Sequence, residues 1–242
     1  MPALCVLQNR RQRLREYWQK RGSLSLQYLF LSDSGSQTAH PYGGCCFDVP
    51  VPSHLPMSLT LVCRESGGKE YLMQQYKEWL DRESRSALWD AEACGRIFSA
   101  WSRMWKEAQR GCRRWDGRAV LSGAALLLCP GRFYLAGAGQ MRAYSYSRGR
   151  LSALYIPRRD LQTPCFLSGP ESAGEIYILM ADVPGIDRKE RRMIQILSGI
   201  RERAGEAEKL RGLFCAAESI RELICRPAPE SIFYPAALVM RS

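Results

Sequence analysis

The segment from residue 119 to residue 156 constrains the fold of this 242-residue chain more than any other part of it. It reads AVLSGAALLLCPGRFYLAGAGQMRAYSYSRGRLSALYI, with turn signals at 130–131 and 148–149 and a glycine-rich kink at 137–139. Three apolar or alternating runs bounded in this way are typical of antiparallel strands. The segment therefore predicts an antiparallel meander.

Strands and helices are expected in groups on both sides of this meander. Apolar runs predict strands at 24–31, 46–51, 57–62, 175–182 and 236–240. Apolar residues at helical spacing predict helices at 69–81, 88–110, 187–200 and 206–225. Groups of strands that alternate with helix pairs, without regular βαβ units, favour an α+β fold of antiparallel sheets covered by helices.

Length and composition are compatible with a single domain over residues 1–242, in which residues 1–22 form a basic N-terminal arm or helix. The sequence has no run of eighteen apolar residues that would predict a membrane span. Its first residues turn basic early and lack an apolar signal stretch, so we expect a cytoplasmic location.

The net charge limits which kinds of partner are expected, and the cysteine spacing argues against a zinc site. A net charge of +11 is compatible with an anionic partner, but the sequence lacks the common nucleic-acid-binding motifs and nucleic acid is not the expected partner. Ten cysteines and two histidines show no zinc-ligand spacing, so we expect reduced, mostly buried thiols. The role of the adjacent pair Cys45-Cys46 stays open.

Four segments resemble the metal-dependent serine/threonine protein phosphatases, the PPM or type 2C family. They are LTLVCRESGG at 59–68, similar to a strand ending in Asp-Gly-x-Gly-Gly; SGAA at 122–125, where the family has Gly-Thr-Thr; GQMRAY at 139–144, similar to Gly-Asp-Ser-Arg-Ala-Tyr; and ILMAD at 178–182, similar to a strand ending in Ser-Asp-Gly. Their order and spacing carry the resemblance across nearly the whole chain. It implies a four-layer α/β/β/α sandwich of two antiparallel sheets flanked by helix pairs.

The resemblance also implies a site at which several carboxylates hold two Mg²⁺ or Mn²⁺ ions, whose shared water attacks phosphorus. In this sequence the bridging acid of the family is replaced by Arg64, and the acid of the meander turn is Gln140. The N-terminal acid falls at about Tyr42, and the phosphate-binding arginine falls near Gln37. The final acid has at best Glu230 as its counterpart.

Asp182 is the acid that remains, followed by Val183 where the family has Gly. One carboxylate cannot hold two divalent cations, so we interpret Asp182 as the remnant of a metal site. The span from Arg142 to Asp182 is also shorter than in the family, which predicts that the flap segment beside the active site is absent.

Two other roles for Asp182 stay open. It is followed by Val183-Pro184-Gly185 and is suited to be a helix N-cap or a turn residue. Alternatively it pairs with Arg64, so that a fixed cation replaces a metal as its counter-charge.

We therefore predict an inactive phosphatase-like protein that acts as a binding or regulatory module. It would have no catalytic residue and no cofactor, with Arg64 and Arg142 contacting an anion or a phosphoprotein or signalling partner. One alternative is a divergent phosphoserine/phosphothreonine phosphatase that uses Asp182 with Glu65 or Glu230 around one Mg²⁺ or Mn²⁺. Another is a basic adaptor that binds nucleic acid or anionic membrane through residues 10–21.

Overall fold

The computed structural model describes part of the chain, mainly its strands and helices. The described residues are 5–6, 26–30, 43–49, 57–63, 93–115, 121–129, 131–157, 163–172, 174–183, 185–200, 206–225 and 236–240, together with the helical positions 71–72, 74–76, 78–79 and 82. Predictions for Arg64, Glu65, Gln37, Tyr42, Glu230 and the basic segment 10–21 fall outside these residues.

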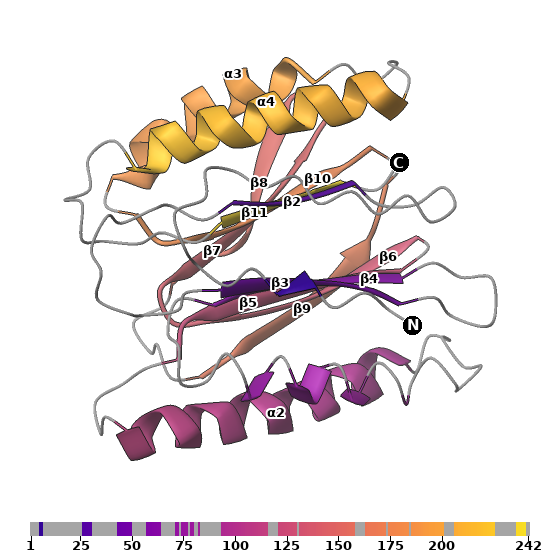
Figure 1. Cartoon of the computed structure of the whole chain (residues 1–242), viewed down its shortest axis with the longest axis vertical. Coiled ribbons are helices and arrows are strands. Elements are labelled where there is room, and N and C mark those ends of the chain that lie inside the picture. Colours follow the sequence, from indigo (N-terminus) through magenta and orange to yellow (C-terminus); the bar gives the residue numbers. More distant parts are fainter. Residues whose placement is uncertain are drawn as a thin grey trace.

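Two antiparallel sheets face each other, and helices cover both outer faces (Figure 1). One sheet has six strands in the order β1-β3-β4-β5-β6-β9, and the other has five in the order β2-β11-β10-β7-β8. The predicted α+β class and four-layer α/β/β/α sandwich are therefore confirmed.

The strands of the six-stranded sheet are β1 (Cys5–Val6), β3 (Gly43–Val49), β4 (Met57–Cys63), β5 (Gly123–Cys129), β6 (Arg132–Ala138) and β9 (Cys165–Pro170). Those of the five-stranded sheet are β2 (Leu26–Phe30), β7 (Met141–Ser147), β8 (Arg150–Tyr155), β10 (Ile176–Ala181) and β11 (Ala236–Met240). The described helices are α2 (Ala93–Trp115), the 3-10 helix η1 (Ile186–Lys189), α3 (Glu190–Ser198) and α4 (Glu206–Cys225).

Each outer helical layer packs on its own sheet through an apolar stripe. On one side Trp101 and Trp105 of α2 join Leu72 and Tyr76, from the helical positions before α2, against the six-stranded sheet. On the other side apolar residues of α3 and α4, such as Met193 and Ile220, lie in one cluster with residues of the five-stranded sheet. Trp101 and Trp105 are therefore core and Phe98 packs against them, as the helical periodicity indicates.

Strand β10 lies in the middle of the five-stranded sheet, between β11 and β7. All six of its residues, IYILMA, are buried. A strand covered on both faces needs an unbroken apolar run, and this explains why its sequence does not alternate. The acidic residue that follows the run is the first polar side chain after the core, so the strand end is the natural place for a site.

The predicted meander divides between the two sheets. Strands β5 and β6 belong to the six-stranded sheet, whereas β7 and β8 belong to the five-stranded sheet. The kink at 137–139 is the point where the chain crosses over, and it separates two strands where the sequence indicated one interrupted run. Gly139 has a φ of +64°, a left-handed conformation that glycine adopts without steric cost.

Helix and strand bounds differ from the predictions at several ends. Helix α2 is described from Ala93 and continues to Trp115, beyond the predicted end at 110. The predicted helix at 187–200 is a 3-10 turn followed by the nine-residue α3. Strand β9 was not predicted, because CFLSGP contains a glycine and ends on a proline, both unfavourable in strands. It pairs with β6 at the edge of its sheet, where proline is tolerated. Among the described helices, none is long and apolar enough to cross a membrane.

Candidate functional site

The candidate site lies where the ends of β7 and β10 meet. In their antiparallel register Met180 of β10 lies opposite Arg142 of β7. The backbone N–H of Asp182 donates to the carbonyl of Gln140 over 2.9 Å, which continues the pairing beyond β10. Two segments that resemble family motifs, far apart in the sequence, are thereby brought side by side.

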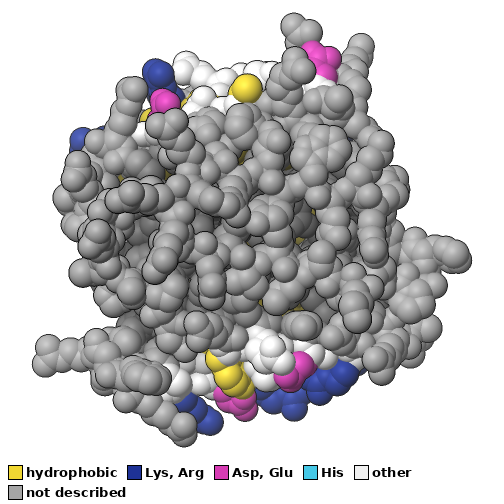
Figure 2. Space-filling model, in the orientation of Figure 1, with side chains coloured by type: hydrophobic (Ala, Val, Ile, Leu, Met, Phe, Trp, Pro, Cys, Tyr) yellow, Lys and Arg dark blue, Asp and Glu magenta, His cyan; other side chains and the backbone are white. Residues whose placement is uncertain are grey.

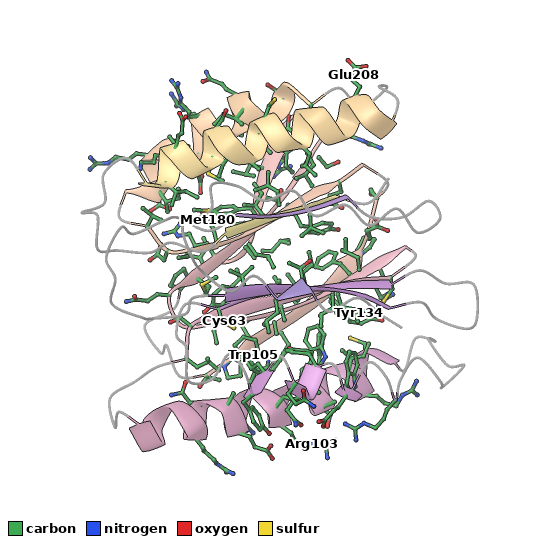
Figure 3. All side chains as sticks on the ribbon, in the orientation of Figure 1. Cys63, Arg103, Trp105, Tyr134, Met180 and Glu208 are labelled. Carbon is green, nitrogen blue, oxygen red and sulfur yellow. The ribbon has the colours of Figure 1, made fainter. Side chains whose placement is uncertain are left out.

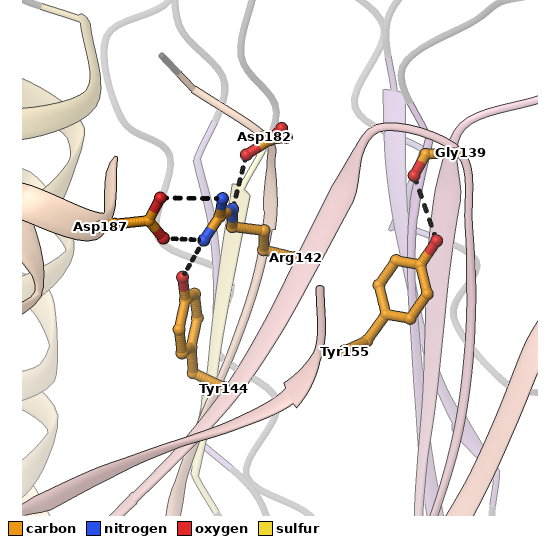
Figure 4. A network of polar contacts seen from close by, with 6 residues as sticks. All are labelled: Gly139, Arg142, Tyr144, Tyr155, Asp182 and Asp187. Atoms are coloured by element: carbon orange, nitrogen blue, oxygen red, sulfur yellow. Dashed lines mark hydrogen bonds and ion pairs between the residues drawn. The ribbon is translucent and has the colours of Figure 1, made fainter. Parts of the chain in front are cut away.

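Arg142 is the centre of a polar network (Figure 4). Its Nε donates to Asp182 Oδ1 over 2.5 Å, and its Nη1 donates to Asp187 Oδ1 over 2.5 Å. Nη1 also donates to the hydroxyl of Tyr144 over 3.1 Å, and Nη2 lies 3.5 Å from Asp187 Oδ2. The network joins β7, the residue after β10 and the helix η1, so it fixes the start of the outer helical layer to the sheet.

Burial differs strongly among the three charged members. The side chain of Arg142 is 9% exposed, that of Asp182 is 32% exposed and that of Asp187 is 70% exposed. The guanidinium is therefore enclosed, whereas the carboxylates reach solvent to different extents. A buried cation requires such partners, because its transfer out of water is costly unless it is paired and hydrogen-bonded.

The ionisation of the network follows from these contacts. Burial by itself works to lower the pKa of Arg142, but its hydrogen bonds with Tyr144, Asp187 and Asp182 outweigh burial and raise the pKa. Burial raises the pKa of the Tyr144 hydroxyl, against the opposing effect of Arg142. Arg142 is accordingly a permanent positive charge within the site.

The adjoining turn is held by its backbone. The N–H of Gln140 donates to Ser122 Oγ over 3.1 Å, and the hydroxyl of Tyr155 donates to the carbonyl of Gly139 over 3.1 Å. A Cβ atom on Gly139 would lie 2.3 Å from Ser122 Oγ, so no larger residue fits there without rearrangement. The resemblance at 122–125 and at 139–144 thus corresponds to two segments in direct contact.

The structure brings Arg142 and Asp182 together, whereas sequence reasoning had paired Asp182 with Arg64. Arg64 lies outside the described residues, and that pair stays a prediction. The N-cap of η1 is Gly185, so Asp182 does not cap the helix that follows. The predicted anion-binding role of Arg142 also stays a prediction, and its guanidinium already contacts two carboxylates.

Asp187 and Tyr144 belong to the network and were missed by sequence reasoning. Asp187 lies in the first turn of η1, five residues after Asp182, and Gly185 with a φ of +75° turns the chain between them. An acid in the first turn of a helix is common because it interacts favourably with the helix dipole. The position of Asp187 in the sequence therefore does not indicate a contact with Arg142. Tyr144 lies two residues from Arg142 on the same face of β7, a relation that the strand period could have indicated.

The residues described at this site do not form a two-metal centre. In the part of the chain that the structure describes, no group of three or more His, Cys, Asp or Glu side chains could hold a metal ion. Asp182 and Asp187 share one guanidinium, and Gln140, at the position of a family acid, is an uncharged amide. Two divalent cations need several anionic oxygen ligands, and these residues do not fit that requirement.

Comparison with known proteins identifies the fold. No protein-family model matches the sequence, and no curated protein matches it. Among solved structures, a serine/threonine phosphatase of S. agalactiae matches with a TM-score of 0.56 at 9% identity, over 89% of this chain and 99% of that chain. RsbX in complex with magnesium matches with a TM-score of 0.53 at 10% identity, over 95% of this chain and all of that chain.

A third match has the same fold at similarly low identity. This structure is described as part of work on the bacterial stressosome, a modular system adapted to control secondary messenger signalling. It matches with a TM-score of 0.52 at 12% identity, over 90% of this chain and all of that chain. Identities near 10% establish the fold alone. The chain has the sandwich fold of the PPM-type serine/threonine phosphatases, as the motif order implied.

Proposed function

We propose that this chain is a phosphatase-like protein that lacks two-metal hydrolysis and acts as a binding or regulatory module. One observation carries the proposal: at the junction of β7 and β10, Asp182 is paired with Arg142 and its neighbour at the family acid position is Gln140. The loss of these acids is consistent with a protein that kept the phosphatase fold after it lost two-metal hydrolysis.

The number of acids is decisive, since the family also has an arginine where this chain has Arg142. A carboxylate that accepts one hydrogen bond from an arginine can still bind a cation. However, Gln140 brings no negative charge, and Arg64 would bring a positive one to the position of the bridging acid. With Asp182 alone, the charge of two divalent cations is not balanced.

A divergent phosphatase is the second candidate function. The side chain of Asp182 remains 32% exposed while it is paired with Arg142, so part of the carboxylate faces solvent. Together with Glu65 or Glu230, it would supply carboxylate ligands for a single Mg²⁺ or Mn²⁺. This candidate requires the metal, whereas the module that we favour requires no cofactor.

Calorimetry and a hydrolysis assay separate the two candidates. We expect no heat of binding when Mn²⁺ is titrated into the protein, and no Mn²⁺-dependent hydrolysis of an aryl phosphate. Hydrolysis that needs Mn²⁺, disappears in Asp182→Ala and persists in Glu208→Ala would overturn the proposal. Glu208 is a suitable control because it is an exposed acid on α4, in the outer helical layer.

The expected partner of the module is a phosphoprotein or another signalling protein, in the cytoplasm. The stressosome match supports a signalling context for this fold, but it carries no partner over to this chain. The third candidate, an adaptor that binds nucleic acid or anionic membrane through residues 10–21, predicts binding that weakens steeply with salt and is lost when Arg10 to Arg15 are neutralised.

A further inference from the structure

Three cysteines meet at one edge of the six-stranded sheet. Strand β1 is the terminal strand of this sheet and lies next to β3. In their antiparallel register Cys5 is opposite Cys46, and Val6 is opposite Cys45. The adjacent pair Cys45-Cys46, whose role the sequence leaves open, is thereby brought beside a cysteine that is far away in the sequence.

The register places Cys5 and Cys46 within reach of a disulfide bond. Residues directly opposite each other in an antiparallel pair have Cα atoms about 4.5–5.5 Å apart. Cysteines joined by a disulfide have Cα atoms about 4.4–6.8 Å apart. The Cα separation that the bond requires is therefore already present in the pairing of β1 with β3.

Strand geometry selects Cys46 rather than Cys45 as the partner of Cys5. Successive residues of a strand lie on opposite faces of a sheet, whereas residues directly opposite each other on neighbouring strands share a face. Cys45 is opposite Leu61 of β4, which belongs to the apolar cluster between this sheet and α2. Cys46 and Cys5 therefore share the other face, toward the five-stranded sheet. The same alternation disfavours a bond between the two adjacent cysteines.

In the described strand pairs, no other cysteine lies opposite Cys5 or Cys46. Cys63 is on β4, the strand next to β3, but its register partner is Gly43. Figure 3 shows Cys63 on the α2 side of the sheet, which is the face on which the register places Cys45. The described free thiols are Cys63, Cys94, Cys129, Cys165 and Cys215.

A bond between Cys5 and Cys46 would fasten a strand that has few contacts of its own. Strand β1 has two residues, so its pairing with β3 supplies few hydrogen bonds, and such an edge opens locally at a small free energy. The chain between the two cysteines includes β2, which lies at the edge of the five-stranded sheet and contacts β3. The bond would therefore close a loop that passes through both sheets, and closing such a loop restricts the unfolded chain.

We propose that Cys5 and Cys46 form a reversible disulfide when the protein encounters a peroxide. One thiol reduces hydrogen peroxide, becomes a sulfenic acid and releases a water molecule. The opposite thiol then attacks the sulfenic sulfur, so that the S–S bond forms and a second water leaves. Two thiols are thus oxidised and one peroxide is reduced, and exchange with a dithiol restores both thiols. Between these events the cysteines are reduced, as expected in a cytoplasm.

Peptide mapping by mass spectrometry tests the proposal on the full-length protein. The protein is reduced, freed of reductant, treated with hydrogen peroxide and digested with trypsin under non-reducing conditions. We expect a disulfide-linked pair of the tryptic peptides 1–10 and 22–64, which contain Cys5 and Cys46. Oxidation should raise Tm by at least about 4 °C, and dithiothreitol should reverse the rise.

Cys45→Ser is the matched control, because it changes the neighbouring residue of the same strand on the other face. The linked peptides should persist in Cys45→Ser and disappear in Cys46→Ser and in Cys5→Ser. Serine in place of cysteine adds no charge, and the described charged side chains seen in Figure 2 lie over the outer helical layers. A difference in Tm between oxidised and reduced protein therefore reports the bond itself. Circular dichroism of the reduced variants checks that they are folded.

Several outcomes would overturn the proposal. Linked peptides that persist in Cys46→Ser, or that disappear in a folded Cys45→Ser, would show that another cysteine is the partner. Oxidation of the exposed Cys215 without any linkage of Cys5 would show that the pair does not react. An equal rise of Tm in Cys5→Ser would assign the stabilisation to another site. The assay involves neither metal nor phosphate ester, so its result is independent of the fate of Asp182.

Discussion

Replacement of Arg142 by methionine should destabilise the protein by an amount that its surroundings determine. Methionine keeps much of the length of the arginine side chain and removes the charge and all donors. Asp182 and Asp187 then lose their shared cation, and the Tyr144 hydroxyl loses a donor. The variant therefore measures how far the ion-pair network stabilises the junction of β7, β10 and η1.

The magnitude follows from the exposure of each partner. Removing one member of a fully buried ion pair costs about 3–5 kcal/mol, whereas an exposed pair contributes about 0–1 kcal/mol. Arg142 is 9% exposed but Asp182 is 32% and Asp187 is 70% exposed, so the carboxylates left behind are partly rehydrated. We expect a loss of about 2 kcal/mol, which for a protein of this size lowers Tm by about 4–8 °C.

Double-mutant cycles by urea denaturation divide this loss between the two carboxylates. The coupling of Arg142→Met with Asp182→Asn should be about 1 kcal/mol and should change little in 1 M KCl. The coupling with Asp187→Asn should be smaller and should decrease in salt, because solvent screens the more exposed partner. A larger coupling to Asp187 than to Asp182, or none to either, would refute the assignment of Arg142 as a buried counter-charge.

Three further expectations concern the helical layer that contains α2, the turn beside the site, and the core. Burial and Glu107 raise the pKa of Tyr71 to about 12, so between pH 10 and 12 the unfolded chain releases a proton that the native state keeps. The midpoint of urea unfolding should therefore fall as the pH rises from about 10 to about 12, and the fall should be smaller in Tyr71→Phe. Gly139→Ala should lower the free energy of unfolding by about 3 kcal/mol, because its Cβ would be strained by the left-handed φ and would overlap Ser122. Gly131→Ala, which has a φ of +73° but no atom within 4 Å of the added Cβ, should cost about 1 kcal/mol. Equal costs for the two variants would contradict the steric argument. Trp105→Phe should lower stability by about 1–2 kcal/mol more than Trp101→Phe, because the Trp105 Nε1 donates over 2.7 Å to a buried hydroxyl and no described group accepts from Trp101 Nε1.

Periodicity and turn chemistry predicted most of the fold. The apolar runs at 57–62 and 236–240 and the helix at 206–225 agree with β4, β11 and α4 to within one residue. These elements carry strong local patterns, so their burial is visible in the sequence itself. What periodicity does not contain is the assignment of strands to sheets, since β6 and β7 are consecutive yet pair in different sheets.

The candidate site was predicted less completely than the fold. The resemblance indicated Asp182 and Arg142, and they are in contact. It did not indicate that they pair with each other, because their relation depends on the register of β7 against β10, which sequence separation does not encode. Asp187 escaped prediction for a related reason: its approach to Arg142 depends on the turn at Gly185. Glycine allows such a turn without specifying its direction.

The backbone hydrogen bonds around the turn at 139–140 have a consequence for how this protein can evolve. The carbonyl of Gly139 and the N–H and carbonyl of Gln140 each have a described partner, and these three contacts use main-chain atoms at both positions. A change of the side chain at position 140 would therefore leave these three contacts in place. Selection can remove or restore an acid there without rebuilding the crossover between the sheets, so inheritance of the scaffold and inheritance of the chemistry are separable.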